Sequence, residues 1–423
     1  MKEDLLHFIW KNVLYNSSDL HTTDGLAVSV IKHGDRNSNA GPDFFNAKIQ
    51  IGETVWAGNV EIHTRSSDWK RHGHHLDTVY DSVILHVVQL ADDVIARTNE
   101  TIIPTLVLDF DKRLLESFDE IFVKNNSISC APKLSSIESI ILQMWFNRML
   151  IERLEYKTAM VSDVLNNTTS NWEGTFYRLL FRSFGFNVNA QAFETLSASL
   201  PLSVIAKHSD SVFQIESLLF GQAGMLEIDC SDEYFISLQS EYHFLKSKYD
   251  LQAMNSHSWK FMRMRPANFP TIRLAQLAQL LYHSSALLSK VIECENVVSL
   301  KKLFDVEVSV YWLTHYSFGK SSNFSAKHLG ETAIQSILIN AIIPVLFHYG
   351  KINANEDLCD KALLFLEHLP FESNEITRQW CTTGIDCDNA ARSQALIHLY
   401  KNYCVAGNCL RCAIGDKLLR LSL

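Results

Sequence analysis

Carboxylate and imidazole side chains, the groups that bind metal ions and move protons, are concentrated between residues 40 and 88 of the chain. Asp43 follows a Gly41-Pro42 pair, and Glu61 and His63 stand two positions apart in an alternating apolar and polar segment. Two neighbouring carboxylates suit a hard divalent cation such as Mg²⁺ or Mn²⁺. A cation of this kind activates water and stabilises charge on a phosphodiester. The stretch therefore predicts a metal-dependent hydrolytic site.

Two strands must bring these residues together. The sequence predicts a hairpin over residues 44–63, with its turn at Gly52-Glu53-Thr54. Alternation along the second arm places Glu61 and His63 together on the face opposite to its apolar residues. Asp43 directly precedes the first arm, so we expect its carboxylate to lie near that of Glu61.

The hairpin residues resemble the pattern of the PD-(D/E)XK nucleases, with Gly41-Pro42-Asp43 and then Asn59-Val60-Glu61-Ile62-His63. The expected order of elements over about residues 1–110 is similar too: a helix, a strand and hairpin with the motif, a helix and a further strand. The resemblance implies a restriction-endonuclease-like fold and a nuclease or phosphodiesterase that acts on nucleic acid. It also implies that Asp43 and Glu61 bind Mg²⁺ or Mn²⁺.

His63 departs from this pattern, because it stands where the family has its lysine. A neutral imidazole accepts a proton or binds a metal, but it does not supply the fixed positive charge of a lysine. The resemblance therefore implies that His63, or Lys48 on the neighbouring strand, positions or deprotonates the attacking water. Glu3, on the expected first helix, would be a supporting acid.

Two other functions fit the same residues. His63, two of the histidines at positions 72, 74 and 75, and Asp77 would form the ligand set of a zinc-dependent hydrolase. Alternatively, the missing lysine indicates a non-catalytic binding or scaffold protein on a degenerate nuclease-like fold. Residues 1–120 contain 19 acidic and 11 basic residues. Because an acidic domain repels nucleic acid, this balance favours the non-catalytic alternative over the nuclease.

A second candidate metal site lies at the C-terminal end. Cys404, Cys409 and Cys412 have C-x4-C-x2-C spacing, and Cys387, or alternatively Cys381, is our expected fourth ligand. Four thiolates suit Zn²⁺ or an iron–sulfur cluster. The alternative is a set of ordinary reduced and buried cysteines.

One segment, at residues 258–269, combines basic and aromatic side chains. Lys260, Arg263 and Arg265, with Arg273 beyond the prolines, are expected contacts for the phosphates of nucleic acid, and Arg65 is another on the strand of Glu61. The alternative is a loop that its aromatic residues anchor to the core. Since the net charge of the chain is −9, any nucleic-acid contact must be local.

The rest of the chain predicts two domains. Residues 1–125 alternate between short helical and strand patterns and are expected to form an α/β domain. From about residue 135 the period is helical almost throughout, so residues 126–423 are expected to form an all-helical domain that carries the cysteines. With 423 residues, of which 47% are hydrophobic, the chain can fill two large cores.

The location and family of the protein are the last expectations. The N-terminal residues lack the pattern of a signal peptide, and the longest apolar run, at residues 333–349, is interrupted by polar residues and a proline. We therefore expect a cytoplasmic protein without membrane spans, in which the nine cysteines are reduced. The sequence from Ala40 to Val88, together with the C-terminal cysteines, resembles an uncharacterised bacterial protein family of unknown function. This resemblance implies no activity.

Overall fold

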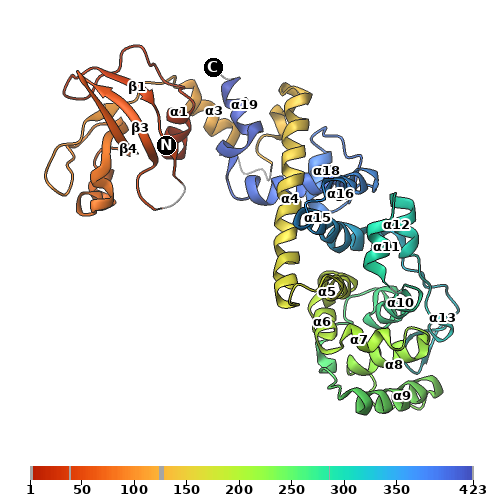
Figure 1. The fold of residues 1–423 in the computed structure, drawn as a ribbon. Helices are drawn as coiled ribbons and strands as arrows, with labels where there is room; N and C mark the ends of the chain where they lie inside the picture. The colour runs from red at the N-terminus through yellow and green to blue at the C-terminus, as the bar shows by residue number, and fades with distance from the viewer. Residues whose placement is uncertain (1–2, 38–39, 123–127, 285, 422–423) are drawn as a thin grey trace. The chain divides into compact units, whose positions relative to one another are not determined.

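The computed structural model describes residues 3–37, 40–122, 128–284 and 286–421, and it divides the chain into two compact units (Figure 1). The first unit consists of Met1–Trp145 with Leu399–Leu423, and the second of Phe146–His398. The boundary that we expected between residues 125 and 126 lies outside the described residues. The C-terminal segment belongs to the first unit because apolar residues of its last helix, such as Leu419, are part of that unit's core.

The first unit is built on a mixed six-stranded sheet with the strand order β1-β3-β4-β5-β6, in which β2 also pairs with β3. The first three pairings are antiparallel, and those of β4 with β5 and of β5 with β6 are parallel. The strands are β1 (Val28–Lys32), β2 (Asp35–Arg36), β3 (Phe44–Ile51), β4 (Thr54–Arg65), β5 (Val83–Leu90) and β6 (Thr105–Val107).

Two apolar clusters support this sheet. The larger one joins the first helix, α1 (Glu3–Lys11), to the strands and includes Val60 and Ile62 of β4. Glu61 and His63 alternate with these two core residues, as the period of a strand requires. The smaller cluster is formed by Trp69, in the short helix α2 (Asp68–Arg71), with three apolar residues at positions 83, 95 and 103.

The second unit is mostly helical, as the sequence predicts for this part of the chain. A small hairpin of β7 (His315–Ser317) and β8 (Lys320–Ser321) interrupts the helices. The helices of the chain after α2 are α3 (Arg113–Phe122), α4 (Ser139–Asn167), α5 (Trp172–Phe184), α6 (Phe186–Ser199), α7 (Leu202–Ala206), α8 (Val212–Gln222), α9 (Glu233–Tyr249), α10 (Pro270–His283), α11 (Leu287–Glu293), α12 (Val297–Leu303), α13 (Val310–Leu313), α14 (Glu331–Ile337), α15 (Ile343–Ile352), α16 (Glu356–His368), α17 (Glu375–Cys381), α18 (Ala390–Leu399) and α19 (Ala413–Arg420).

One helical stretch, Glu331–Ile352, is long and apolar enough to cross a membrane by length and composition. It runs through α14, a π-helical turn at Leu338–Ile342 and α15. Within its most apolar window 78% is buried inside the unit, which is also the pattern of a core helix. Pro344 lies in the first turn of α15, and the π-helical turn before it accommodates the missing backbone N–H.

Candidate metal centre

Asp43 and Glu61 meet at the open end of the β3–β4 hairpin. The backbone N–H of Asp43 donates to Oε2 of Glu61 over 3.0 Å, and the N–H of Ile62 donates to Oδ2 of Asp43 over 2.9 Å. These reciprocal bonds follow from the register, in which Phe44 pairs with Val60. The same Asp43 oxygen lies 3.1 Å from Nε2 of His7 on α1. One oxygen of each carboxylate is therefore occupied within the hairpin, and Asp43 is held against α1.

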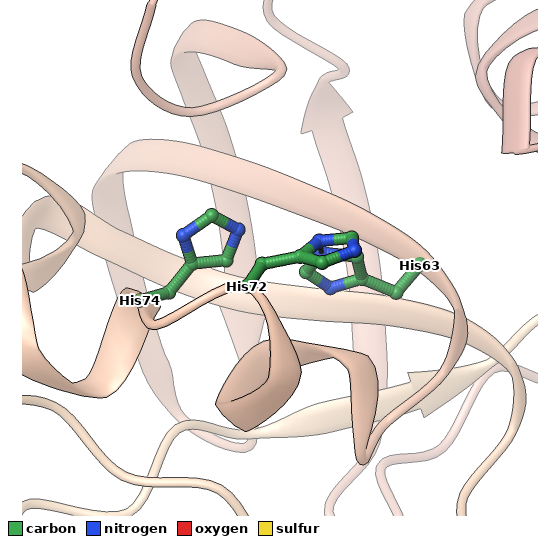
Figure 2. Close-up of side chains that lie close together, drawn as sticks. All are labelled: His63, His72 and His74. Atoms are coloured by element: carbon green, nitrogen blue, oxygen red, sulfur yellow. Dashed lines mark hydrogen bonds between the residues drawn. The ribbon is translucent and has the colours of Figure 1, made fainter.

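The other oxygen of Glu61 faces imidazoles. Its Oε1 lies 3.2 Å from Nε2 of His74 and 3.6 Å from Nε2 of His63. The same nitrogen of His63 lies 3.1 Å from Nδ1 of His72. One ring nitrogen from each histidine falls within 4.8 Å of the others, and Figure 2 shows the three rings gathered together. We refer to Glu61, His63, His72 and His74 as the histidine–glutamate cluster.

Different local structures supply its members. His63 comes from β4, His72 directly follows α2, and His74 opens a short 3₁₀ helix at His74–Leu76. Gly73 between the last two has φ +79°, in the left-handed region that residues with a Cβ adopt only with strain. This reversal lets two histidines so close in sequence turn toward the same strand.

The spacing of the cluster resembles that of a coordination shell. A tetrahedral ion with ligand bonds of about 2.0–2.1 Å holds its ligand atoms about 3.3 Å from one another. The three short contacts of the cluster are 3.1, 3.2 and 3.6 Å. Imidazole nitrogen and carboxylate oxygen are both ligands that Zn²⁺ accepts. The three imidazoles therefore form a group that could hold one ion, and Glu61 lies beside His63 and His74.

Burial favours the neutral form of the imidazoles at this site. It lowers the pKa of His63 to about 2 and that of His86 to about 3, with neighbouring imidazoles adding to the effect. Burial, and then the charge of Asp43, raises the pKa of Glu61 to about 8. The imidazoles are thus neutral near pH 7, which is the form that binds metals.

Residues behind the cluster orient it. Nδ1 of His63 lies 2.8 Å from Nε2 of His86, a fully buried side chain on β5. The ring of His74 stacks on Tyr80 at 3.7 Å between centroids, and Trp69 packs edge-on against it. Partners of this kind fix the tautomer and the direction of a metal-binding histidine.

Two side chains at the cluster meet solvent, those of Glu3 and His72. His72 is exposed, and the Glu3 side chain is 37% exposed. Oε1 of Glu3 lies 3.8 Å from Nε2 of His63, so α1 contributes a carboxylate beside the ring nitrogens. Burial raises the pKa of Glu3 to about 7. The sequence alone marks Glu3 only through the nuclease resemblance, because 58 positions separate it from Glu61.

Three other residues expected at this site make contacts outside the histidine–glutamate cluster. Lys48 is exposed and pairs with Ala57, four residues and about 13 Å along β4 from Glu61. Arg65 is exposed and lies 3.4 Å from Asp92. Asp77 caps a short 3₁₀ helix by accepting the N–H of Val79. Burial lowers the pKa of His74 and the charge of Asp77 is among those that oppose this effect, so Asp77 lies near that ring, although Glu61 is the carboxylate at 3.2 Å from it.

The C-terminal cysteines gather around a partner that the sequence analysis missed. Burial raises the pKa of the Cys404 thiol, and Cys130, Cys412 and Cys409 add to the effect, so these four thiols lie near one another. Cys387 is not part of this group, because it forms a disulfide with Cys381 in the second unit. This corrects the expected ligand set. Cys130 precedes Cys404 by 274 positions, so no local spacing could reveal it.

The basic and aromatic segment lies in the second unit. Arg263 and Arg265 line a cavity there, together with Arg273. Lys260 is exposed and is not among the residues that line it. Trp259 is buried and donates to the carbonyl of Ala223 over 2.9 Å, so it anchors the segment to the core.

Comparison with known proteins places the chain in a family. No match was found among curated proteins or among solved structures. A family model described as a protein of unknown function (DUF2851) matches residues 3–375, which is nearly the whole chain. The expectation of an uncharacterised family is thereby confirmed, and the chain belongs to the DUF2851 family of proteins of unknown function.

Proposed function

We propose that the first unit is a metal-dependent hydrolase whose ion is bound by the histidine–glutamate cluster. The observation that carries the proposal is the grouping of one ring nitrogen each of His63, His72 and His74 within 4.8 Å of one another. Contacts of 3.1–3.6 Å link His72 to His63, His63 to Oε1 of Glu61, and this oxygen to His74. Three imidazoles and one carboxylate favour Zn²⁺, or another first-row transition ion, over Mg²⁺. This is the histidine-based alternative of the sequence analysis, with Glu61 in place of Asp77.

A divalent ion at this position would lower the pKa of a water molecule and polarise the bond that is cleaved. Glu3 is placed to accept the proton of that water, since its Oε1 lies beside the ring nitrogens and its side chain reaches solvent. His86 holds the ring of His63 in place from the buried side. Asp43 and His7 brace the hairpin against α1 next to Glu61.

A nuclease of the PD-(D/E)XK type is the second candidate. In its favour, Asp43 and Glu61 converge, and the order α1, β1, the β3–β4 hairpin, α2 and β5 is the one that the resemblance implies. Against it, one oxygen of Asp43 is already held by the Ile62 N–H and faces His7, and Lys48 lies away from the acids. Because this candidate differs from the first in its metal ion, the assay includes Mn²⁺ and Mg²⁺ beside Zn²⁺. Nucleic acid is the first substrate to test for both candidates.

The test combines metal content with hydrolysis. Purified full-length protein is analysed for bound metal and assayed on single- and double-stranded DNA and RNA and on a small phosphodiester. His72→Ala and His63→Ala are expected to lose one ion per chain and the hydrolytic activity together. His75→Ala is the matched control, because it removes a neighbouring imidazole outside the cluster. Equal metal content and activity in all four proteins would refute the proposal.

The non-catalytic alternative predicts a different result. If the unit only binds a partner, the wild type retains its metal but cleaves none of these substrates at any of the three ions. In that event the cluster is a structural metal centre, and the hydrolase proposal is abandoned.

We also propose that Cys130, Cys404, Cys409 and Cys412 bind Zn²⁺ or an iron–sulfur cluster as a structural centre. The backbone N–H groups of Ile414 and Gly415 donate to the Cys412 sulfur. Hydrogen bonds of this kind stabilise a thiolate, the form that binds metal. Such a centre would tie the C-terminal segment to the rest of the first unit.

A further inference from the structure

The second unit contains a cavity of about 680 Å³ where the α5–α6 junction meets the loop before α10. Three arginines line it, at positions 263, 265 and 273, and among the described residues that line it none is Asp or Glu. This composition is unusual in a chain that carries a net charge of −9. We refer to it as the arginine cavity.

Arg273 is the buried member of the three, with 8% of its surface exposed. Nη1 and Nη2 donate to the neutral oxygens of Gln276 and Asn268, and Nε has no partner in the described part of the chain. The guanidinium lies 4.7 Å from the ring centroid of Phe186, which also lines the cavity. Burial alone lowers the pKa of Arg273 to about 10, so the side chain stays cationic near pH 7. A buried cation without an acidic partner is costly unless a ligand supplies the opposite charge.

Arg263 and Arg265 are held at the mouth of the cavity by a fixed loop. The Asn189 amide both accepts from the backbone N–H of Lys260 and donates to its carbonyl, over 2.9 and 3.0 Å. Arg263 has φ +61°, a left-handed conformation that costs free energy in a residue with a Cβ. Both arginines are exposed, and neither forms an ion pair within the described residues.

A neighbouring cavity of about 380 Å³ provides the contrast. It shares Phe186 with the arginine cavity and is also lined by cations, but these have partners. Arg182 pairs with Glu194, and Lys157 donates to the Ile339 carbonyl and to Asn340. Arg182 is therefore a cation that a carboxylate already neutralises, whereas none of the three arginines of the arginine cavity has an acidic partner within the described residues.

We propose that the arginine cavity binds the phosphate group of a phosphate ester or polyphosphate. The planar guanidinium matches a phosphate by paired hydrogen bonds. Three cations without acids match a group with two or more negative charges better than a single carboxylate. The volume lies within the range of small-ligand sites, about 300–1,000 Å³. The aromatic ring of Phe186 beside the cation offers a surface on which a base can stack.

The test is direct binding to the full chain by calorimetry, at low and at moderate salt, with inorganic phosphate, pyrophosphate, a short single-stranded oligonucleotide and citrate. Pyrophosphate is expected to bind, and Arg273→Gln is expected to weaken binding about tenfold or more. Arg263→Gln, an exposed change that the fold tolerates, should weaken it as well. Arg182→Gln is the matched control, because it removes a cation that already has an acidic partner, and it should leave the affinity unchanged.

The arms of the experiment separate the sources of phosphate. Tight binding of pyrophosphate alone assigns a small polyphosphate ligand, and tighter binding of the oligonucleotide assigns a nucleic-acid strand. Citrate binding as tightly as pyrophosphate would overturn the assignment to phosphate. Unchanged affinity in both Arg273→Gln and Arg263→Gln would overturn the site. None of these outcomes depends on the metal centre, because the variants lie in the other unit.

Discussion

The two units of this protein gather opposite kinds of polar atom. In the first unit, ring nitrogens and carboxylate oxygens converge from α1, β4 and the turn after α2. In the second, guanidinium groups converge on one cavity without a carboxylate among the described residues that line it. Buried polar groups are normally paired within the protein. This difference is the basis of the two proposals, a cation in the first unit and an anion in the second.

The local reasons for the two arrangements also differ. The first depends on β alternation and on a left-handed glycine, which aim side chains from neighbouring segments at one point. The second depends on α10, whose first turn places Arg273 beside a loop that Asn189 holds from another helix. In both centres, residues that are close in sequence are completed by a segment that is distant in sequence: Glu3 on α1 in the first, and Phe186 and Asn189 in the second.

The largest expected effect concerns the histidine–glutamate cluster of the first unit. Adding Zn²⁺ at about 1,000 times its Kd to metal-free protein should stabilise the wild type by about 4 kcal/mol. His63→Ala should lose the share due to the cluster, and because both proteins keep their cysteines, the difference between them isolates that share. Calorimetric unfolding with and without the ion measures it. The same zinc-induced increase in Tm for both proteins would break the comparison at its first unit.

The cysteine group provides the next effect. Cys130→Ser should remove one metal ion, or one iron–sulfur cluster, per chain and lower the free energy of unfolding by roughly 2–4 kcal/mol, in the range of lost structural ligands. Cys387→Ser is the control and should leave the metal content unchanged, since Cys387 is bonded to Cys381. Metal analysis of the two variants decides between them. A loss in Cys387→Ser alone would restore the ligand set expected from the sequence.

At the arginine cavity we expect a smaller effect on stability, and one that depends on whether pyrophosphate is present. Without anion, Arg273→Gln should change the free energy of unfolding by less than about 1 kcal/mol, because the lost hydrogen bonds are offset by relief of an uncompensated charge. With pyrophosphate, only the wild type should gain stability. Denaturant unfolding with and without pyrophosphate tests both statements. A loss above about 3 kcal/mol without anion would make Arg273 an ordinary structural residue and remove the contrast between the units.

The smallest expected effect tests whether Lys48, on the strand next to Glu61, has any part in the proposed site. Lys48→Ala should change stability by less than about 0.5 kcal/mol and leave any hydrolytic activity at the wild-type level, because the side chain is exposed and distant from Glu61. Arg65→Ala should behave in the same way. A large loss of activity in Lys48→Ala, with metal content unchanged, would instead favour the nuclease of the second candidate.

Regular patterns made much of the fold predictable. The expected hairpin arms at residues 44–51 and 55–63 correspond to β3 and β4, since a period of two with β-branched and aromatic residues is a strong signal. Long-range packing limited other predictions. Residues 298–314, which have one helical period, form α12 and α13 with a break between them, and the β7–β8 hairpin was missed. Both features lie where tertiary contacts override weak local preferences.

By itself, the sequence determined which chemical groups are present and which strand carries them: two carboxylates and a histidine on one hairpin, with further histidines shortly after it. Only the tertiary structure decided which of these groups meet. It brought His72 and His74, rather than His75, to His63, added Glu3 from the first helix, and placed Cys130 near the C-terminal cysteines. The physical reason is that side-chain periodicity is a local property of the backbone, whereas the donor atoms of a binding site converge through packing between segments with no fixed spacing in sequence.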